Sequence, residues 1–110
     1  MLHVDPWHWL DSDGELPRDN PPLRRQALRI ARFIEYGAEL APGEVRLTLV
    51  ECRRRPGRRP CLGLMMVLKN PDGTLEAACP ECGEPEVLIR NWQDTFWAHG
   101  LPEPLPPLEG

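Results

Sequence analysis

The sequence predicts a small α+β protein in which one N-terminal helix packs on a small antiparallel sheet. Apolar residues recur with a helical period over 21–37 and with a strand period from residue 45. The length of 110 residues suits one compact core. We therefore expect a single domain over residues 1–99, followed by a flexible tail over 100–110.

The composition is that of an ordinary soluble protein, with 41% hydrophobic and 27% charged residues. The net charge of −4 opposes a general attraction to nucleic acid, although residues 45–99 hold eight bases against seven acids. No apolar run approaches the roughly 18 residues of a spanning helix, so we expect no membrane contact. The start lacks the pattern of a secretory signal, which favours a cytoplasmic protein with reduced thiols.

Residues 1–20 predict an irregular arm. The segment mixes tryptophans with acids, prolines and a glycine, and neither a helical nor a strand period runs through it. We expect it to pack on the body through Trp7, Trp9 and Leu10. It also holds a group of acids, Asp11, Asp13 and Glu15, which nothing in the sequence marks as a catalytic pair.

Residues 21–37 predict the helix. Asn20 suits the N-cap, two prolines suit the first turn, and Gly37 suits the C′ position after the last turn. The arginines at 25, 29 and 32 share the side opposite the apolar residues, which favours a solvated basic face. The apolar stripe consists of Leu23, Ala27, Ile30, Ala31 and Ile34.

Residues 45–92 predict the sheet. Residues 45–52 alternate between two faces, 61–69 form a short and nearly continuous apolar run, and 74–79 and 86–92 follow as further strands. Turns are expected at 40–44 and 70–73 because proline, glycine and Asx residues gather there. The aromatic residues Trp92, Phe96 and Trp97 favour core packing over base stacking, and the proline-rich 100–110 favours an extended tail.

Cys79 and Cys82 form the most informative motif, Cys-Pro-Glu-Cys-Gly. Two thiolates separated by two residues on a tight turn can share a tetrahedral ion, and Gly83 relieves the conformation that the turn imposes. Thiol redox chemistry would instead need the motif to open a helix within a βαβ unit. Here it lies between two predicted strands, which favours metal binding.

Cys52 and Cys61 flank the segment Arg-Arg-Arg-Pro-Gly-Arg-Arg-Pro. Pro56 and Gly57 suit the two central positions of a type II turn. Folding the segment about their bond places Arg55 opposite Arg58, and Cys52 opposite Cys61, at the base of a basic hairpin. Disulfides remain an alternative for all four cysteines, with three possible connectivities.

The spacing C-x8-C-x17-C-x2-C resembles that of a zinc ribbon, and the resemblance covers residues 45–92. It implies that two cysteine-bearing turns at the end of a zinc-ribbon-type sheet hold one structural zinc. Cys79-Cys82 is also similar to half of a rubredoxin site, but the matching first half is absent. His3, His8 and His99 are possible substitute ligands. The implied zinc ligands are Cys52, Cys61, Cys79 and Cys82.

The segment between the first two cysteines predicts a binding surface. Glu51 is the only acid within or beside it, so the segment is expected to project positive charge toward nucleic-acid phosphates or an acidic protein surface. A loop that stays solvated or pairs with the protein's own acids at 11–19 is the remaining alternative. Its arginines are Arg53, Arg54, Arg55, Arg58 and Arg59. A closed four-thiolate site leaves no position for an activated water, and no hydrolase triad, phosphate-binding loop or HExxH motif occurs.

The sequence thus predicts a non-catalytic binding module that binds nucleic acid through its arginine hairpin. Two alternatives stay open. The hairpin can instead serve a protein adaptor or a self-assembling protein, or Cys79 and Cys82 can carry out thiol redox chemistry.

Overall fold

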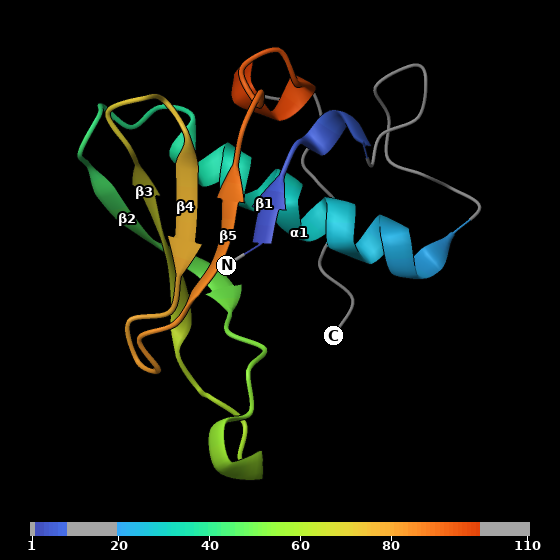
Figure 1. The fold of residues 1–110 in the computed structure, drawn as a ribbon, viewed down its shortest axis with the longest axis vertical. Coiled ribbons are helices and arrows are strands. Elements are labelled where there is room, and N and C mark those ends of the chain that lie inside the picture. Colours follow the sequence, from blue (N-terminus) through green and yellow to red (C-terminus); the bar gives the residue numbers. More distant parts are fainter. Residues whose placement is uncertain (1, 9–19, 100–110) are drawn as a thin grey trace.

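The computed structural model describes residues 2–8 and 20–99. It is an α+β fold in which one α-helix lies across one face of a five-stranded sheet (Figure 1). The strands lie in the order β1-β5-β4-β3-β2. The elements are β1 (Leu2–Val4), α1 (Pro21–Gly37), β2 (Val45–Glu51), β3 (Leu64–Lys69), β4 (Leu75–Ala78) and β5 (Pro85–Ile89), with 3₁₀ turns at Pro6–His8, Pro56–Arg58 and Phe96–His99.

Strand β1 corrects two expectations from the sequence. Residues 2–4 are not irregular, because they pair in parallel with β5, and the sheet is therefore mixed rather than antiparallel. A three-residue strand is too short to show a period, so the pattern could not reveal it. Asp5 fixes the turn that follows, since its carboxylate accepts hydrogen bonds from the backbone N–H of Trp7 and the side-chain amide of Asn91.

Helix α1 has the bounds that the sequence predicted. The Asn20 side chain accepts a hydrogen bond from the Leu23 N–H at 3.2 Å and caps the first turn. The predicted stripe is confirmed, because its members from Ala27 onward are buried and Leu23 is half-buried. The solvated basic face is wrong at Arg29, which is only 6% exposed.

Gly37 does not have the expected role at C′. It is the last helical residue, and the C-cap is Ala38, whose backbone is also right-handed. A Cβ at Gly37 would lie 2.8 Å from side-chain atoms of Leu75 and Val67. The glycine is therefore required because the helix lies so close to β3 and β4.

The four later strands are confirmed, with ends up to three residues from those expected. Both predicted turns are present: the Glu44 N–H donates to the Ala41 carbonyl, and the Gly73 N–H donates to the Asn70 carbonyl. Strand β2 has an irregularity between Leu47 and Glu51, where its pairing with β3 shifts register. It lies at the open edge of the sheet (Figure 1).

The core lies between α1 and the facing side of the sheet. Phe33 and Ile34 of the helix are fully buried against Val67 and Ile89 of the sheet. Trp92 and Trp97 are also buried in this cluster, as predicted, and the Trp92 ring lies under Lys69 Nζ at 4.9 Å. Of the expected arm contacts, Trp7 donates from Nε1 to the Asn91 carbonyl.

Several expectations fall outside the described residues. Trp9, Leu10, the acids at 11, 13 and 15, the side chains of Phe96 and His99, and the tail at 100–110 belong to this group. Over residues 2–8 and 20–99, no helix is both long and apolar enough to span a bilayer.

Candidate metal centre

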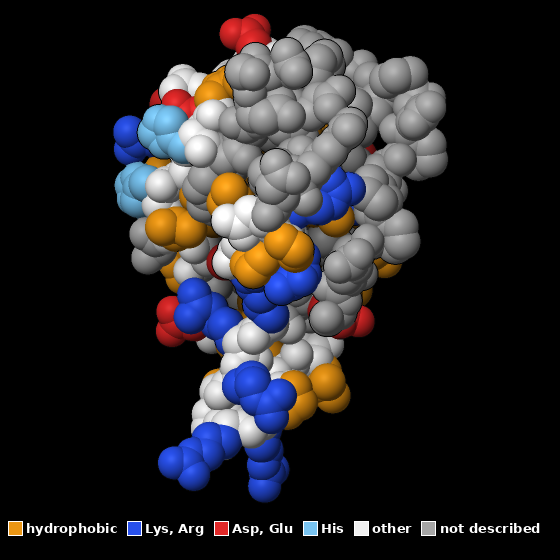
Figure 2. Space-filling view, turned by 90° about the vertical axis from the view of Figure 1, so that its right-hand side faces the viewer, with side chains coloured by type: hydrophobic (Ala, Val, Ile, Leu, Met, Phe, Trp, Pro, Cys, Tyr) orange, Lys and Arg blue, Asp and Glu red, His pale blue; other side chains and the backbone are white. Residues whose placement is uncertain are grey.

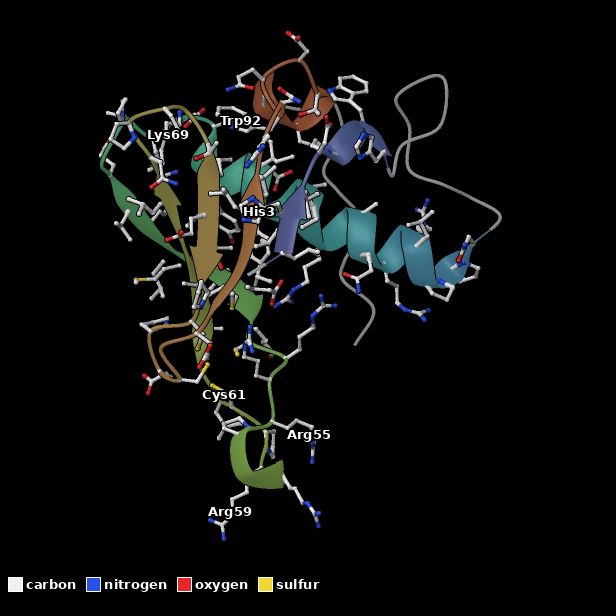
Figure 3. All side chains as sticks on the ribbon, in the orientation of Figure 1. His3, Arg55, Arg59, Cys61, Lys69 and Trp92 are labelled. Carbon is white, nitrogen blue, oxygen red and sulfur yellow. The ribbon has the colours of Figure 1, made fainter. Side chains whose placement is uncertain are left out.

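Cys61 stands on a hairpin that projects from one end of the sheet (Figure 3), and Cys52 begins the same hairpin. Its register differs from the expected one. The Cys61 N–H donates to the Arg54 carbonyl, and the Cys52 N–H donates to the Gly63 carbonyl, so Cys52 lies opposite Gly63 rather than Cys61. The hairpin is thus centred on the bond between residues 57 and 58, one residue later than predicted.

The turn at its tip explains the shift. Gly57 and Arg58 both have positive φ, at 61° and 68°. Two successive residues with positive φ form the turn whose twist matches the strands of a tight hairpin. The type II geometry predicted from Pro56 and Gly57 does not match that twist. The arginine in the left-handed region bears a local cost, which the sequence did not reveal.

Cys79 and Cys82 stand on the turn between β4 and β5. The Gly83 N–H donates to the Cys79 carbonyl at 2.8 Å, and Gly83 has φ of 73°. The predicted role of this glycine in closing the turn is therefore confirmed. The turn lies against the base of the arginine hairpin, so the two cysteine pairs meet.

The four sulfurs lie within 4.8 Å of one another and could bind a metal ion. Cys52 Sγ is 3.9 Å from Cys82 Sγ, and Cys61 Sγ is 3.6 Å from Cys79 Sγ. A tetrahedral zinc site with Zn–S bonds of about 2.3 Å has sulfurs about 3.8 Å apart. None of the four cysteines forms a disulfide in the structure.

The surroundings of Cys52 and Cys79 shift the pKa values of the two thiols in opposite directions. Burial raises the pKa of Cys52 to about 12. Burial also opposes ionisation of Cys79, but backbone N–H groups of Cys82 and Glu81 donate to its sulfur and lower its pKa to about 7. A turn that already stabilises one thiolate favours the binding of a cation.

Gly63 lies directly against the Cys79-Cys82 turn. A Cβ at this position would lie 2.9 Å from Cys79 Sγ and 2.6 Å from Glu81 Cγ. Only a residue without a side chain lets the chain just before β3 approach the Cys79-Cys82 turn so closely. The sequence held a weak signal for this role, since Gly63 follows Cys61 at a short distance as Gly83 follows Cys82.

The histidines do not join the cysteines in the part of the chain that the structure describes. His3 lies on β1, at the edge of the sheet opposite β2, and its Nδ1 is 3.1 Å from an Arg90 nitrogen. His8 is exposed on the 3₁₀ turn after β1. Neither is among the groups that could hold a metal.

The five hairpin arginines divide into two sets. Arg53 and Arg54 turn back onto the protein: Arg53 donates to Gln26 Oε1 at 2.9 Å, and Arg54 donates to the Pro85 carbonyl at 3.0 Å. Arg55, Arg58 and Arg59 lie at the tip and are exposed, with Arg55 bonded only to the Arg58 carbonyl among described residues. Figure 2 shows blue side chains extending from the end of the projecting hairpin.

A buried ion pair anchors the hairpin to the body. Arg29 on α1 donates two hydrogen bonds of 2.8 Å to the Glu86 carboxylate on β5. Arg53 adds its charge at 3.8 Å from the same carboxylate. Burial and the charge of Arg29 lower the pKa of Arg53, while Glu86 acts in the opposite direction. The sequence offered no signal for this pairing because the three residues are far apart in the chain.

Comparison with family models, curated proteins and solved structures gives no match to this chain. The proposed function therefore rests on the site alone. The structure brings together all four predicted metal ligands, holds two of the predicted arginines against the body and leaves three at the tip of the hairpin.

Proposed function

We propose that the chain is a non-catalytic binding module in which a structural zinc fixes the base of an arginine hairpin that contacts the phosphate backbone of a nucleic acid. The observation that carries the proposal is the position of Arg55, Arg58 and Arg59. All three are exposed. Arg55 and Arg59 lie beyond Cys61, toward the end of the hairpin away from the body (Figure 3), and Arg58 belongs to the turn between them.

Zinc suits the sulfur set better than other ions. Four thiolates in tetrahedral spacing select zinc or iron among the common biological metals. A redox iron site of the rubredoxin kind uses two C-x-x-C-G turns, and this chain has that motif once. The resemblance to zinc ribbons supports the same choice, since the hairpin and the Cys79-Cys82 turn correspond to the two cysteine-bearing turns of that family.

The ion acts as a folding element. The hairpin from 52 to 61 contributes few buried side chains of its own, because residues 53 to 60 are exposed. A structural zinc supplies roughly 10 kcal/mol or more of apparent binding energy, which a small domain can use to order such a segment. With four protein ligands no coordination position is left for water, so the ion supports structure rather than catalysis.

The tip suits phosphate contacts. Guanidinium groups match phosphate oxygens with two parallel hydrogen bonds, and three of them stand here without a neighbouring carboxylate among the described residues. The net charge of −4 opposes binding elsewhere on the protein. We therefore expect contact at the hairpin tip alone, where the guanidinium groups bind phosphate oxygens of the backbone.

The test is the salt dependence of binding by the zinc-loaded full chain to duplex DNA, single-stranded DNA and RNA. Three phosphate contacts predict a slope of log K against log salt of roughly −2 to −3, and each arginine removed should lower its magnitude by about one. Arg59→Ala should weaken binding. Arg25→Ala removes one exposed charge from α1 and serves as the matched control, which should bind as the unmodified chain does.

The result is decisive in both directions. Binding that weakens with salt and with Arg59→Ala, but not with Arg25→Ala, supports the proposal. If zinc-loaded protein binds none of the three nucleic acids, the proposal is wrong. Binding of polyglutamate under the same conditions would then identify an acidic protein surface as the partner.

A further inference from the structure

Strand β2 leaves part of its edge unpaired. The Lys69 N–H donates to the Glu44 carbonyl, and residues 45, 46 and 47 face 68, 67 and 66 of β3. Backbone groups in an antiparallel pair alternate between the two edges. Residues 44 and 46 therefore bond toward β3, and the N–H and C=O groups of Val45 and Leu47 point away from the sheet.

The rest of the edge is already protected. At the irregularity in β2, the Thr48 hydroxyl accepts from the Val50 N–H and donates to the Met65 carbonyl. The Leu49 N–H donates to the Tyr36 hydroxyl at 3.3 Å, so the end of α1 covers that point. Within the part of the chain that the structure describes, the backbone groups of Val45 and Leu47 therefore stay free. Glu51 also faces outward, because the neighbouring Cys52 bonds to Gly63, but its exposed carboxylate disfavours pairing at that point.

The side chains on the same stretch are apolar and exposed. Val45 is 51% exposed, Leu47 59% and Leu49 80%, on the face of the sheet opposite α1. Leu64, Met66 and Leu68 of β3 continue this surface and are half-buried. Edge strands usually carry charges or prolines that prevent pairing with another chain. The outer face of this edge carries neither at residues 45, 47 and 49.

We propose that β2 pairs in antiparallel fashion with β2 of a second copy of this chain, with the two-fold axis beside Leu47. Leu47 then lies opposite Leu47 of the second copy, and the two residues exchange both backbone hydrogen bonds. Val45 meets Leu49 of the second copy on the apolar face through side chains alone, because the Leu49 N–H is bonded to Tyr36. The two sheets join into one continuous sheet.

Charge selects this register over its neighbours. With the axis beside Leu47, Arg46 lies opposite Thr48 of the second copy. With the axis beside Arg46, two arginines would lie directly opposite each other, which is unfavourable. A two-fold axis also requires a surface that complements itself, and a row of aliphatic side chains along an open edge meets that condition. A nucleic acid has no peptide backbone to pair with this edge, and an acidic peptide would place carboxylates against exposed aliphatic side chains.

The experiment is the oligomeric state of the zinc-loaded full chain, measured by sedimentation over a range of concentrations and without nucleic acid. We expect a dimer that dissociates on dilution, because edge pairing buries a small area. Leu47→Pro removes only an outward-facing N–H, which an edge strand tolerates, and should abolish the dimer. Arg46→Ala leaves both the edge groups and the apolar row in place and should keep it.

Three results would overturn the proposal. The first is a chain that stays monomeric at the highest concentration reached. The second is a dimer that survives Leu47→Pro but is lost in Leu47→Lys, since association would then use the apolar face without strand pairing. The third is a dimer whose Leu47 N–H exchanges with solvent as fast as that of the monomer.

This inference stands apart from nucleic-acid binding. The variant with Arg55, Arg58 and Arg59 changed to alanine should dimerise as the unmodified chain does, and Leu47→Pro should bind nucleic acid with unchanged salt slope per chain. Loss of dimer formation in the triple variant would show that the hairpin, rather than β2, holds the copies together, and would contradict the proposal.

Discussion

Gly63 and Cys79 approach each other so closely that a Cβ on Gly63 would lie 2.9 Å from the Cys79 sulfur. The glycine stands on the strand leaving the arginine hairpin, and the cysteine begins the turn that carries the second thiolate pair. The contact therefore joins the two halves of the candidate metal centre. It depends on the absence of a side chain and not on a positive φ, since Gly63 has none.

Changing Gly63 to alanine should weaken metal binding. The added methyl group must displace either Glu81, whose Cγ would be 2.6 Å away, or the Cys79 sulfur itself. Changes next to metal ligands typically cost about 10–100-fold in affinity. Competition with a chelator measures the effect. Adding Glu81→Ala removes the Cγ contact but keeps the Glu81 Cβ at 2.8 Å and the Cys79 sulfur at 2.9 Å, so affinity in the double variant should stay below that of the unmodified chain; full recovery would show that these two contacts are unimportant.

Gly37→Ala should destabilise the protein without changing metal affinity. Alanine is favoured over glycine in a helix by about 1 kcal/mol. The new Cβ would nevertheless lie 2.8 Å from buried Leu75 and Val67 atoms, and overpacking of this kind costs typically 1–3 kcal/mol. Urea unfolding of zinc-loaded protein should show a net loss. An increase in stability would mean that the core relaxes more easily than this packing implies.

Breaking the ion pair between Arg29 and Glu86 should be costly on either side. The side chains are 8% and 14% exposed, so removing one partner leaves a largely buried charge. We expect Arg29→Ala or Glu86→Ala to lower the free energy of unfolding by roughly 3 kcal/mol. The paired change Arg29→Met with Glu86→Leu should cost much less, and a double variant as unstable as the single ones would contradict this view.

The same pair predicts a pH dependence. Burial alone would raise the pKa of Glu86, but hydrogen bonds and charge from Arg29 outweigh it and lower the pKa below its usual value of 4.5. The stabilisation is therefore complete above that value and is lost as pH falls through the lower, folded pKa. Comparison of Glu86→Gln with the unmodified chain isolates this effect, because loss of metal in acid is common to both. Their difference in stability should shrink below pH 4.5.

The sequence predicted those features that are set by local pattern. The helix has its expected bounds because Asn20, two prolines and a helical period mark it without ambiguity. The Cys79-Cys82 turn is also local, since Gly83 and the two sulfurs lie within five residues. All four cysteines could be named as ligands because their spacing resembles that of a zinc ribbon, although eight residues separate Cys52 from Cys61.

Features that depend on contacts between segments far apart in the chain could not be predicted from the sequence. β1 pairs with β5 although 85 positions separate Leu2 from Val87, and no period reveals a three-residue strand. Arg29 was expected in solvent because its helical position says nothing about Glu86 on the sheet. The hairpin register was wrong by one residue at its centre, since Arg58 adopts a positive φ that the sequence gives no reason to expect.

Native mass spectrometry of the purified full chain, combined with thiol titration, tests the central claim most directly. The account predicts one zinc ion per chain and four thiols that react only after the ion is removed. Two results would contradict it. One is a chain that carries no metal and has two disulfide bonds. The other is a folded chain whose hairpin is ordered although all four thiols react.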